Sequence, residues 1–420
     1  MKILQVIHCF PPESMTGSEI YAYNLAKELS KRHEISVFYR VNNPKYKEYE
    51  IIKGTYDGLY VYKINNTLRG YNTEKIYKNK DIESKFIEIL EEVKPDIVHI
   101  HHLLFLSTGI ISEIKKRHIP IIFTLHDYWM LCPKGQLLRN NMRVCKNPLN
   151  SNCFYCLAMS LNIKSLFKRL HNFSFRFNKP SEKGSVKLRG IYDGVDLFIS
   201  PSRFLRDKFI KFGIPSEKII HSDNGLNLSL FKDAGKTKSD KIRFGFIGTF
   251  IPSKGVHVII RAFNSIKGNR AVLKIYGKSP VNNGFFDYFH RMNMLAAGNK
   301  NIKFMGMFDN NQVASVFKEI DVLIFPSIWE ENSPLVLHEA ILTKTPVLAS
   351  DIGGVPELIK NGENGFLFNP GDYRNLYRGM MDIIESPSIV KGIRYNNSII
   401  KNIVDNGVEM EDMYVKELNK

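Results

Sequence analysis

Two carboxylates stand close together in the second half of the chain, in the run Glu331-Asn-Ser-Pro-Leu-Val-Leu-His-Glu339. Ser333 and Pro334 suit the N-cap and the first position of a helix. We therefore expect Glu331 just before a helix and Glu339 in its second turn. A helix N-terminus suits a diphosphate, and nearby carboxylates can accept hydrogen bonds from sugar hydroxyls. A plainer interpretation is also open, in which Glu331 favours the helix dipole and Glu339 lies on a solvated face.

Two glycine turns flank this pair in the sequence. Upstream, Gly248-Thr-Phe-Ile-Pro-Ser-Lys254-Gly255 closes an expected strand and opens a helix. A glycine at a strand end lets the backbone approach a ligand closely, and a lysine there offers charge to a phosphate. Downstream, Asp351-Ile-Gly-Gly-Val-Pro-Glu357 forms another such turn. All three segments are expected where a nucleotide would bind.

The first half holds two further candidate segments at strand ends. The loop that begins at His8 reaches Gly17 and Ser18 before the first expected helix, and an ordinary strand-to-helix turn capped by Ser18 explains it equally well. His126 ends another expected strand, in the run Thr-Leu-His126-Asp-Tyr-Trp. A histidine there would face a groove between two α/β domains, although a lone histidine is more often structural.

Strand-like and helix-like segments alternate along almost the whole chain. Short β-branched runs followed by segments of helical period are typical of parallel sheets covered by helices. The strands that we expect are 3–6, 35–38, 97–100, 121–124, 197–200, 218–220, 243–247, 272–276, 301–304, 322–325, 347–349 and 365–368. The helices that we expect between them include 18–29, 82–93, 108–116, 256–264, 312–320 and 335–342.

This order predicts an α/β fold of two Rossmann-like, doubly wound domains that face each other across a cleft. We expect an N-terminal domain at 1–232, a polar linker at 233–240 and a C-terminal domain at 241–385. A helical segment follows at 386–420, and the sequence leaves open whether it crosses back to the first domain. Ligands in such sheets bind at the carboxyl ends of the strands, which is where the candidate residues fall.

The second half resembles the retaining glycosyltransferases of family four, which have the GT-B fold. Glu331 and Glu339 match the family's E-x7-E motif, and Gly248, Lys254 and Gly255 match its glycine turn followed by Lys-Gly. The resemblance implies that Glu331 contacts the donor sugar, Glu339 binds the ribose hydroxyls and Lys254 neutralises the leaving diphosphate. It also implies that domain 241–385 binds a nucleotide sugar. The recognised motifs reach from the first strand to about residue 371 and are more specific in the C-terminal half.

Two positions depart from the family pattern. Many members have an arginine directly after the first glycine, where this chain has Thr249, so one phosphate contact is in question. The first loop keeps Gly17 but has Ser18 instead of the family's second glycine. The donor-binding residues implied by the resemblance are Gly17, Gly248, Thr249, Lys254, Asn332, Ser333, Pro334, Leu335 and Glu339.

In the first half, His126 matches a family histidine that contacts the donor sugar, so the implied catalytic residues are His126, Lys254 and Glu331. The implied reaction moves a sugar from a nucleotide-sugar donor (a UDP- or GDP-sugar) to a lipid-linked or saccharide acceptor, in polysaccharide or glycan assembly. The anomeric configuration is retained. Catalysis would rest on positioning and electrostatics, with no catalytic metal.

Three other functions remain open. Thr249 is compatible with a protein that binds a nucleotide sugar without turnover, and some sugar-nucleotide epimerases share the two-domain fold. The formal net charge of +17 raises a third alternative, nucleic-acid binding. Against that alternative, the chain has no recognisable nucleic-acid module and its basic residues are spread out apart from one segment. We therefore expect no nucleic-acid partner.

Four of the five cysteines fall in one short segment. Cys132, Cys145, Cys153 and Cys156 form C-x12-C-x7-C-x2-C, a thiolate set suited to zinc. The segment has little apolar periodicity, and a metal would supply the missing stabilisation. We expect structural zinc, with four reduced, unligated thiols or an iron–sulfur cluster as the alternatives.

The segment 163–177 has apolar residues at helical spacing and basic residues on the opposite face. Such a helix can lie in an anionic membrane interface, and it can equally pack on the first domain. The chain begins with a strand-like segment instead of a signal peptide and lacks an apolar run of about 20 residues. We therefore expect a cytoplasmic protein, peripheral on the inner face of the membrane if the membrane interpretation holds.

Overall fold

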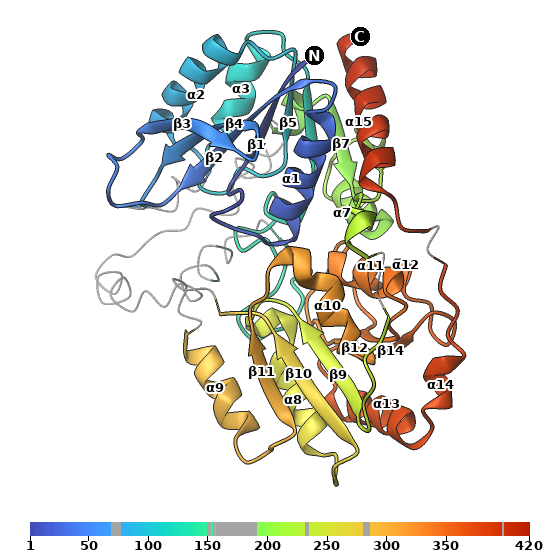
Figure 1. Cartoon of the computed structure of the whole chain (residues 1–420). Helices are drawn as coiled ribbons and strands as arrows, with labels where there is room; N and C mark the ends of the chain where they lie inside the picture. The colour runs from blue at the N-terminus through green and yellow to red at the C-terminus, as the bar shows by residue number, and fades with distance from the viewer. Residues whose placement is uncertain are drawn as a thin grey trace.

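The computed structural model describes residues 1–68, 77–148, 153, 156, 191–231, 235–279, 286–396 and 399–420. Two sheets, one from each half of the chain, form two lobes with helices packed on their faces (Figure 1). The predicted α/β fold with two Rossmann-like lobes is confirmed. The N-terminal lobe begins in blue and green in Figure 1, and the C-terminal lobe runs from yellow to red-orange.

The sheet of the N-terminal lobe has eight strands: β1 (Lys2–Ile7), β2 (Glu34–Val41), β3 (Ile51–Tyr56), β4 (Leu59–Asn65), β5 (Ile97–Ile100), β6 (Ile121–Thr124), β7 (Leu197–Ser200) and β8 (Ile219–His221). Their spatial order is β3-β4-β2-β1-β5-β6-β7-β8, and only the β3–β4 pair is antiparallel. Within the described ranges, the helices of this lobe are α1 (Gly17–Leu29), α2 (Lys80–Val93), α3 (Gly109–Lys115) and α7 (Arg203–Lys211).

The sheet of the C-terminal lobe has six parallel strands: β9 (Ile242–Ile247), β10 (Ala271–Tyr276), β11 (Ile302–Gly306), β12 (Val322–Phe325), β13 (Val347–Ser350) and β14 (Phe366–Phe368). Their order is β11-β10-β9-β12-β13-β14. The helices described in this lobe are α8 (Val256–Asn264), α9 (Phe286–Ala296), α10 (Val313–Lys318), α11 (Leu335–Leu342), α12 (Val355–Leu358), α13 (Tyr373–Glu385) and α14 (Ser388–Lys391), and the last helix of the chain is α15 (Ile403–Leu418).

The central strands are apolar because helices cover both faces of each sheet. Strands β5, β6, β7, β12 and β13 are buried at every position. Continuous Val, Ile, Leu and Phe runs of this kind are typical of parallel sheets. The polar side chains of each lobe are therefore concentrated at the strand ends and in the loops that follow them.

Each sheet reverses its winding direction at one point, and the candidate residues follow the strands at these points. In the first sheet β1 lies between β2 and β5, and in the second β9 lies between β10 and β12. The loops after such neighbouring strands diverge and leave a crevice for a ligand. The loops after β9 and β12 carry Lys254 and Glu331, whereas the loop after β1 leads to Gly17.

The last helix, α15, packs against α1 of the N-terminal lobe (Figure 1, red helix beside α1). The Tyr21 hydroxyl donates to Asn406 Oδ1 at 3.0 Å, and Tyr414 Oη lies 2.6 Å from His99 Nδ1. Met410 and Tyr414 are fully buried in the same core cluster as β1 and β2. The last helix of the chain therefore completes the hydrophobic core of the N-terminal lobe.

Replacing Tyr414 by Phe should destabilise the N-terminal lobe. His99 is fully buried, and burial lowers its pKa to about 3, so it is neutral and needs hydrogen-bond partners for both ring nitrogens. Removing the hydroxyl leaves Nδ1 without one, which should cost about 1–3 kcal/mol in the free energy of unfolding. Urea denaturation measures it. Tyr60→Phe, at a side chain that is 57% exposed, is the matched control. Equal urea midpoints for Tyr414→Phe and Tyr60→Phe would contradict this role of the Tyr414 hydroxyl.

Candidate active site

The carboxylate of Glu331 lies in the loop after β12 and is 4% exposed. Its Oε1 accepts hydrogen bonds from Lys254 Nζ at 2.6 Å, Ser327 Oγ at 2.7 Å and Trp329 Nε1 at 2.6 Å. Its Oε2 has no hydrogen-bond partner among the described residues. A buried charge has to be balanced, and the ammonium of Lys254 does this. The second oxygen is the atom left for a ligand hydroxyl.

Lys254 reaches this carboxylate from the turn between β9 and α8. Gly255 follows it with φ 73°, a left-handed conformation that disfavours other residues. A Cβ at Gly255 would also collide with the carbonyl oxygen of Pro326, at the end of the neighbouring strand β12. The Lys254 ammonium lies 5.4 Å from the centroid of the Trp329 ring, within cation–π range. A glycine is therefore required for this lysine to lie against the β12 loop.

Gly248 and Thr249 form the turn directly after β9. The Gly248 N–H donates to the carbonyl of Tyr276 at 3.1 Å, and Gly277 packs on the Gly248 carbonyl so closely that a Cβ there would collide. Thr249 is half-buried, and its hydroxyl has no partner within the described ranges. The turn therefore stands beside Lys254 at the same edge of the sheet.

The N-terminus of α11 is open. The helix begins at Leu335 with Pro334 as its N-cap, and no side chain caps it. The prediction that Ser333 is the N-cap and Pro334 the first helical residue is wrong by one position. The Ser333 hydroxyl lies 3.0 Å from His338 Nε2 instead. Since no side chain in the described part of the chain occupies the first N–H groups of α11, they are available to an anion.

Gly17 is the residue of the N-terminal lobe that lies next to the start of α11. It is the first residue of α1, and a Cβ built on it would lie 3.9 Å from Leu335 Cδ1. The N-termini of α1 and α11 therefore meet across the lobe boundary. Their partial positive charges converge on one region, which favours a bound anion.

Glu339 lies in the second turn of α11, as predicted, and is partly buried. Its carboxylate has no hydrogen-bond partner within the described part of the chain, and burial raises its pKa to about 7. A desolvated carboxylate gains stabilisation from any donor that reaches it. It is therefore suited to accept hydrogen bonds from a ligand.

His126 lies just after β6, in a row of histidines that line the strand ends of the N-terminal lobe. Its Nε2 is 3.2 Å from His101 Nδ1, and the ring stacks on His101 with centroids 5.4 Å apart. Burial, with a smaller effect from the charge of His102, lowers the pKa of His126 to about 3. His126 is therefore a neutral imidazole near pH 7, able to donate or accept a hydrogen bond.

Asn332, predicted as a donor-binding residue, uses its side chain to join the lobes. Its Nδ2 donates to the carbonyls of Leu125 at 3.2 Å and His126 at 3.3 Å, and its Oδ1 accepts from Ser202 Oγ at 2.6 Å. Ser202 also caps α7 by accepting from the Leu205 N–H at 3.2 Å. Both amide hydrogens of Asn332 are thus directed to the N-terminal lobe, which ties the backbone of His126 to the Glu331 loop.

Two further residues bridge the lobe boundary: Glu330, which the sequence analysis missed, and Glu357, which it placed in a turn expected near a nucleotide. Glu330 pairs with Lys208 of α7 at 2.6 Å. The carboxylate of Glu357 accepts from the N–H groups of Arg203 at 2.9 Å and Phe204 at 2.5 Å, so it caps α7 from the other lobe. No sequence signal marks these contacts, because their partners are more than 100 positions away.

The four clustered cysteines are all described, and none of them forms a disulfide bond. Among the residues that the structure describes, no group of three or more His, Cys, Asp or Glu side chains could hold a metal ion. Lys134 Nζ lies 4.0 Å from Cys156 Sγ. The structure does not assemble Cys132, Cys145, Cys153 and Cys156 around a metal position, and structural zinc stays a prediction.

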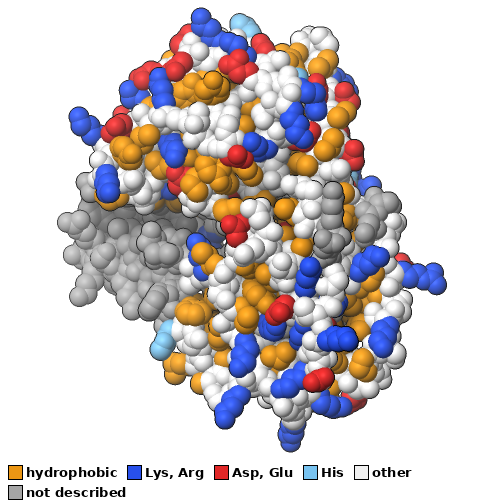
Figure 2. Space-filling model, viewed as in Figure 1, with side chains coloured by type: hydrophobic (Ala, Val, Ile, Leu, Met, Phe, Trp, Pro, Cys, Tyr) orange, Lys and Arg blue, Asp and Glu red, His pale blue; other side chains and the backbone are white. Residues whose placement is uncertain are grey.

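The predicted amphipathic helix at 163–177 lies outside the described residues. Of the helices in the described ranges, none has the length and apolar character to cross a bilayer. On the face seen in Figure 2, lysine and arginine side chains are scattered over both lobes and interleaved with acidic ones.

The ionisation of Glu339 should make the free protein less stable as pH rises from 6 to 8. Its pKa in the folded protein, about 7, lies above the ordinary 4.5, so its contribution to stability is complete below pH 4.5 and is lost as pH rises through 7. Relative to Glu339→Gln, the free energy of unfolding should fall by up to about 1 kcal/mol over this range. Urea denaturation at each pH measures it, with exposed Glu363→Gln as the control. A pH-independent difference between wild type and Glu339→Gln would contradict the assignment.

Replacing Asn332 by Ala should weaken the contact between the lobes. Three hydrogen bonds are lost and two buried backbone carbonyls lose a donor, so we expect a loss of about 1–3 kcal/mol in unfolding free energy. Small-angle scattering should show a larger radius of gyration as the lobes separate. Asn311→Ala, at an exposed side chain of the C-terminal lobe, is the control and should change neither quantity. If Asn332→Ala leaves both the unfolding free energy and the radius of gyration unchanged, Asn332 does not hold the lobes together.

Comparisons with known proteins give the family. The model for "Glycosyltransferase Family 4" matches residues 15–230, and that for "Glycosyl transferases group 1" matches residues 230–403. An uncharacterized 42.6 kDa protein in the cps region of Klebsiella pneumoniae is 25% identical, over 85% of this chain and 87% of its own length. An Escherichia coli UDP-Gal:alpha-D-GlcNAc-diphosphoundecaprenol alpha-1,3-galactosyltransferase is 24% identical, over 84% and 85%.

Solved structures show the same fold. Anabaena HepE in complex with UDP and glucose superposes with a TM-score of 0.68 at 17% identity, over 99% of both chains. The family match covers more than half of the chain, and both lobes carry the architecture of this neighbour. The chain belongs to glycosyltransferase family 4 and is a glycosyltransferase of the GT-B fold.

Proposed function

We propose that this glycosyltransferase moves a sugar from a nucleoside diphosphate sugar to an acceptor hydroxyl with retention of anomeric configuration. The observation that carries the proposal is the Lys254–Glu331 pair, 2.6 Å apart, at the crevice between β9 and β12. A cation and a carboxylate placed together suit the two parts of such a donor, its phosphates and its sugar. The structural neighbour HepE, whose complexes contain UDP and UDP-glucose, supports this class of donor.

In the proposed complex the diphosphate lies against the open N-terminus of α11. Lys254 exchanges its bond with Glu331 for one with the phosphates, and the N–H groups at the start of α11 supply further donors. Glu331 Oε2 then accepts from a hydroxyl of the donor sugar. Glu339 accepts from the ribose hydroxyls, which favours its ionised form. Thr249, where many family members have arginine, contributes a hydroxyl in place of a second cation.

The acceptor approaches from the N-terminal lobe, past Gly17 and the histidine row. Neutral His126 can donate a hydrogen bond to the transferred sugar without adding a charge. We propose that the acceptor oxygen attacks on the face that the diphosphate leaves, and that a leaving phosphate oxygen takes the acceptor proton. Lys254 and the α11 dipole stabilise the negative charge that develops on the phosphate, which is the largest contribution expected from the protein.

The acceptor that we propose is a growing glycan or a lipid-linked saccharide in polysaccharide assembly. The Escherichia coli relative is named for a diphosphoundecaprenol-linked acceptor, and the Klebsiella relative for a cps region. A lipid-linked acceptor would bring the enzyme to the cytoplasmic face of the membrane. Vesicles that contain the acceptor lipid should then retain the protein in co-sedimentation.

Thermal unfolding with a panel of UDP-, GDP- and ADP-sugars tests the donor. A donor at a hundred times its dissociation constant should stabilise the fold by about 2.7 kcal/mol. Lys254→Met and Glu339→Ala should each lose most of this response, because they remove the phosphate cation and the ribose acceptor. Lys303→Met, at an exposed lysine of the same lobe, is the control and should keep it.

The stereochemistry is checked on the product. With the donor so identified, the anomeric proton coupling of the product should match that of the donor sugar. An inverted anomer would contradict retention. A response to no nucleotide sugar, or one that both Lys254→Met and Glu339→Ala keep in full, would contradict the proposed donor site.

A further inference from the structure

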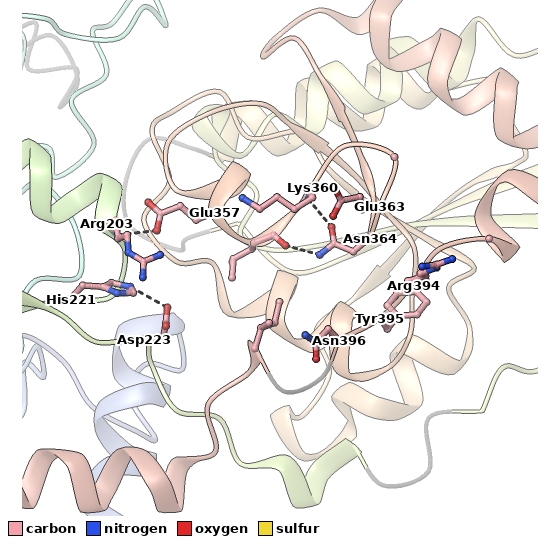
Figure 3. Close-up of a pocket in the computed structure, with 14 residues that line it drawn as sticks. Arg203, His221, Asp223, Glu357, Lys360, Glu363, Asn364, Arg394, Tyr395 and Asn396 are labelled. Carbon is pink, nitrogen blue, oxygen red and sulfur yellow. Dashed lines mark hydrogen bonds and ion pairs between the residues drawn. The ribbon is translucent and has the colours of Figure 1, made fainter.

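A second pocket lies at the lobe boundary and contains none of the residues assigned to the donor. It has a volume of about 810 Å³, and we call it the interlobe pocket (Figure 3). Arg203, His221 and Asp223 line it from the N-terminal lobe, and Glu357 to Asn364 line it from the C-terminal lobe. The remaining wall is formed by residues that precede α15 in the chain, namely Gly392, Arg394, Tyr395, Asn396 and Ile399. Cavities of this size are typical of small-molecule sites.

Two of the three carboxylates in this pocket already have partners. Asp223 Oδ1 lies 3.3 Å from His221 Nε2. The carboxylate of Glu357 accepts the two N–H groups at the start of α7. Burial would raise the pKa of Asp223, but the hydrogen bond and charge of His221 hold it below its usual value. Glu363, at the exposed rim, is the carboxylate that remains.

The cations of the pocket are less compensated. The guanidinium groups of Arg203 and Arg394 form no ion pair within the described part of the chain, and Figure 3 shows them on opposite sides of the pocket. The ammonium of Lys360 donates to the carbonyl of Pro356 at 2.7 Å, which leaves its charge unbalanced. Charges of both signs therefore line the pocket, and its two guanidinium groups are the side chains that suit a carboxylate or phosphate.

Tyr395 adds a polar group that lacks a partner. Its hydroxyl is buried and forms no hydrogen bond with any described residue. Burial raises its pKa, so the hydroxyl stays protonated and can donate. A buried hydroxyl without a partner costs free energy, and a polar ligand in the pocket would satisfy it.

We propose that the interlobe pocket binds a small anionic metabolite, whose phosphate or carboxylate groups contact Arg203 on one side of the pocket or Arg394 on the other, and whose polar body meets Tyr395. Because the two arginines come from the N-terminal lobe and the returning segment, the occupant bridges the lobes. It stabilises the same lobe arrangement that Asn332 and Glu357 hold. The site is an effector site and goes beyond the proposed transfer reaction, on which it does not depend.

Isothermal titration of the whole protein with glucose 6-phosphate, citrate and inorganic phosphate tests the site, with uncharged glucose as the negative probe. Glucose 6-phosphate separates a sugar phosphate from phosphate alone, and citrate tests the carboxylate. We expect at least one anion to bind and glucose not to bind. Arg203→Gln and Arg394→Gln should each weaken the binding about tenfold or more. Arg270→Gln, an exposed arginine of the C-terminal lobe, is the matched control and should bind as the wild type does.

Two further measurements distinguish the interlobe pocket from the proposed donor site. Lys254→Met should keep the anion affinity, and Arg394→Gln should keep the thermal response to the nucleotide sugar. Anion binding that is lost in Lys254→Met but kept in both arginine variants would place the anion in the donor site and overturn the proposal. Absence of binding by all three anions at millimolar concentration would overturn it as well, and neither result would bear on the transfer reaction.

Discussion

The carboxylate of Glu331 sets the requirement that most of the site satisfies. It is almost completely buried, so its charge has to be met by donors on the protein, and Lys254, Ser327 and Trp329 all converge on one of its oxygens. These donors come from the ends of β9 and β12, which are neighbours only because the sheet changes its winding direction there. The close approach of the two loops in turn requires Gly255 against the carbonyl of Pro326. The fold that brings the loops after β9 and β12 together is therefore also what stabilises the buried charge of Glu331.

The loop after β12 also fixes the position of the two lobes relative to each other. Three consecutive residues contact three different partners. Glu330 pairs with Lys208, Glu331 pairs with Lys254, and Asn332 binds the backbone after β6. A displacement of one lobe therefore moves the carboxylate that we assign to the donor sugar. This arrangement couples the relative position of the lobes to the geometry of the candidate donor site. The Glu357 cap on α7 reinforces the coupling from the neighbouring turn.

Sequence reasoning was sufficient for features that depend on local pattern. The bounds of β5, β6, β7 and β12 agree with the prediction because each is a short apolar run between polar loops. Helix α11 also has its predicted range, although Ser333 hydrogen-bonds to His338 and does not cap it. The hairpin of β3 and β4 was missed, even though Asp57-Gly58 between two strand-like runs is a turn signal that could have revealed it. Helices α7 and α9 were also missed.

Features that depend on distant partners could not be predicted. Nothing local distinguishes Asn332 as a bridge to Ser202 from Asn332 as a donor ligand, since both uses need an amide side chain just before a helix. The packing of Tyr414 on His99 joins positions 315 apart, so only the folded chain reveals that α15 completes the first lobe. The residue types at the donor site were visible in the sequence, whereas the contacts that hold the two lobes together were not.

The central claim is that Lys254 exchanges Glu331 for the diphosphate of the donor at the N-terminus of α11. A crystal structure of the protein with UDP tests it most directly. The account predicts phosphate oxygens within hydrogen-bond distance of Lys254 Nζ and of the first N–H groups of α11, with the ribose at Glu339. UDP bound elsewhere, with the Lys254–Glu331 bond intact, would contradict it.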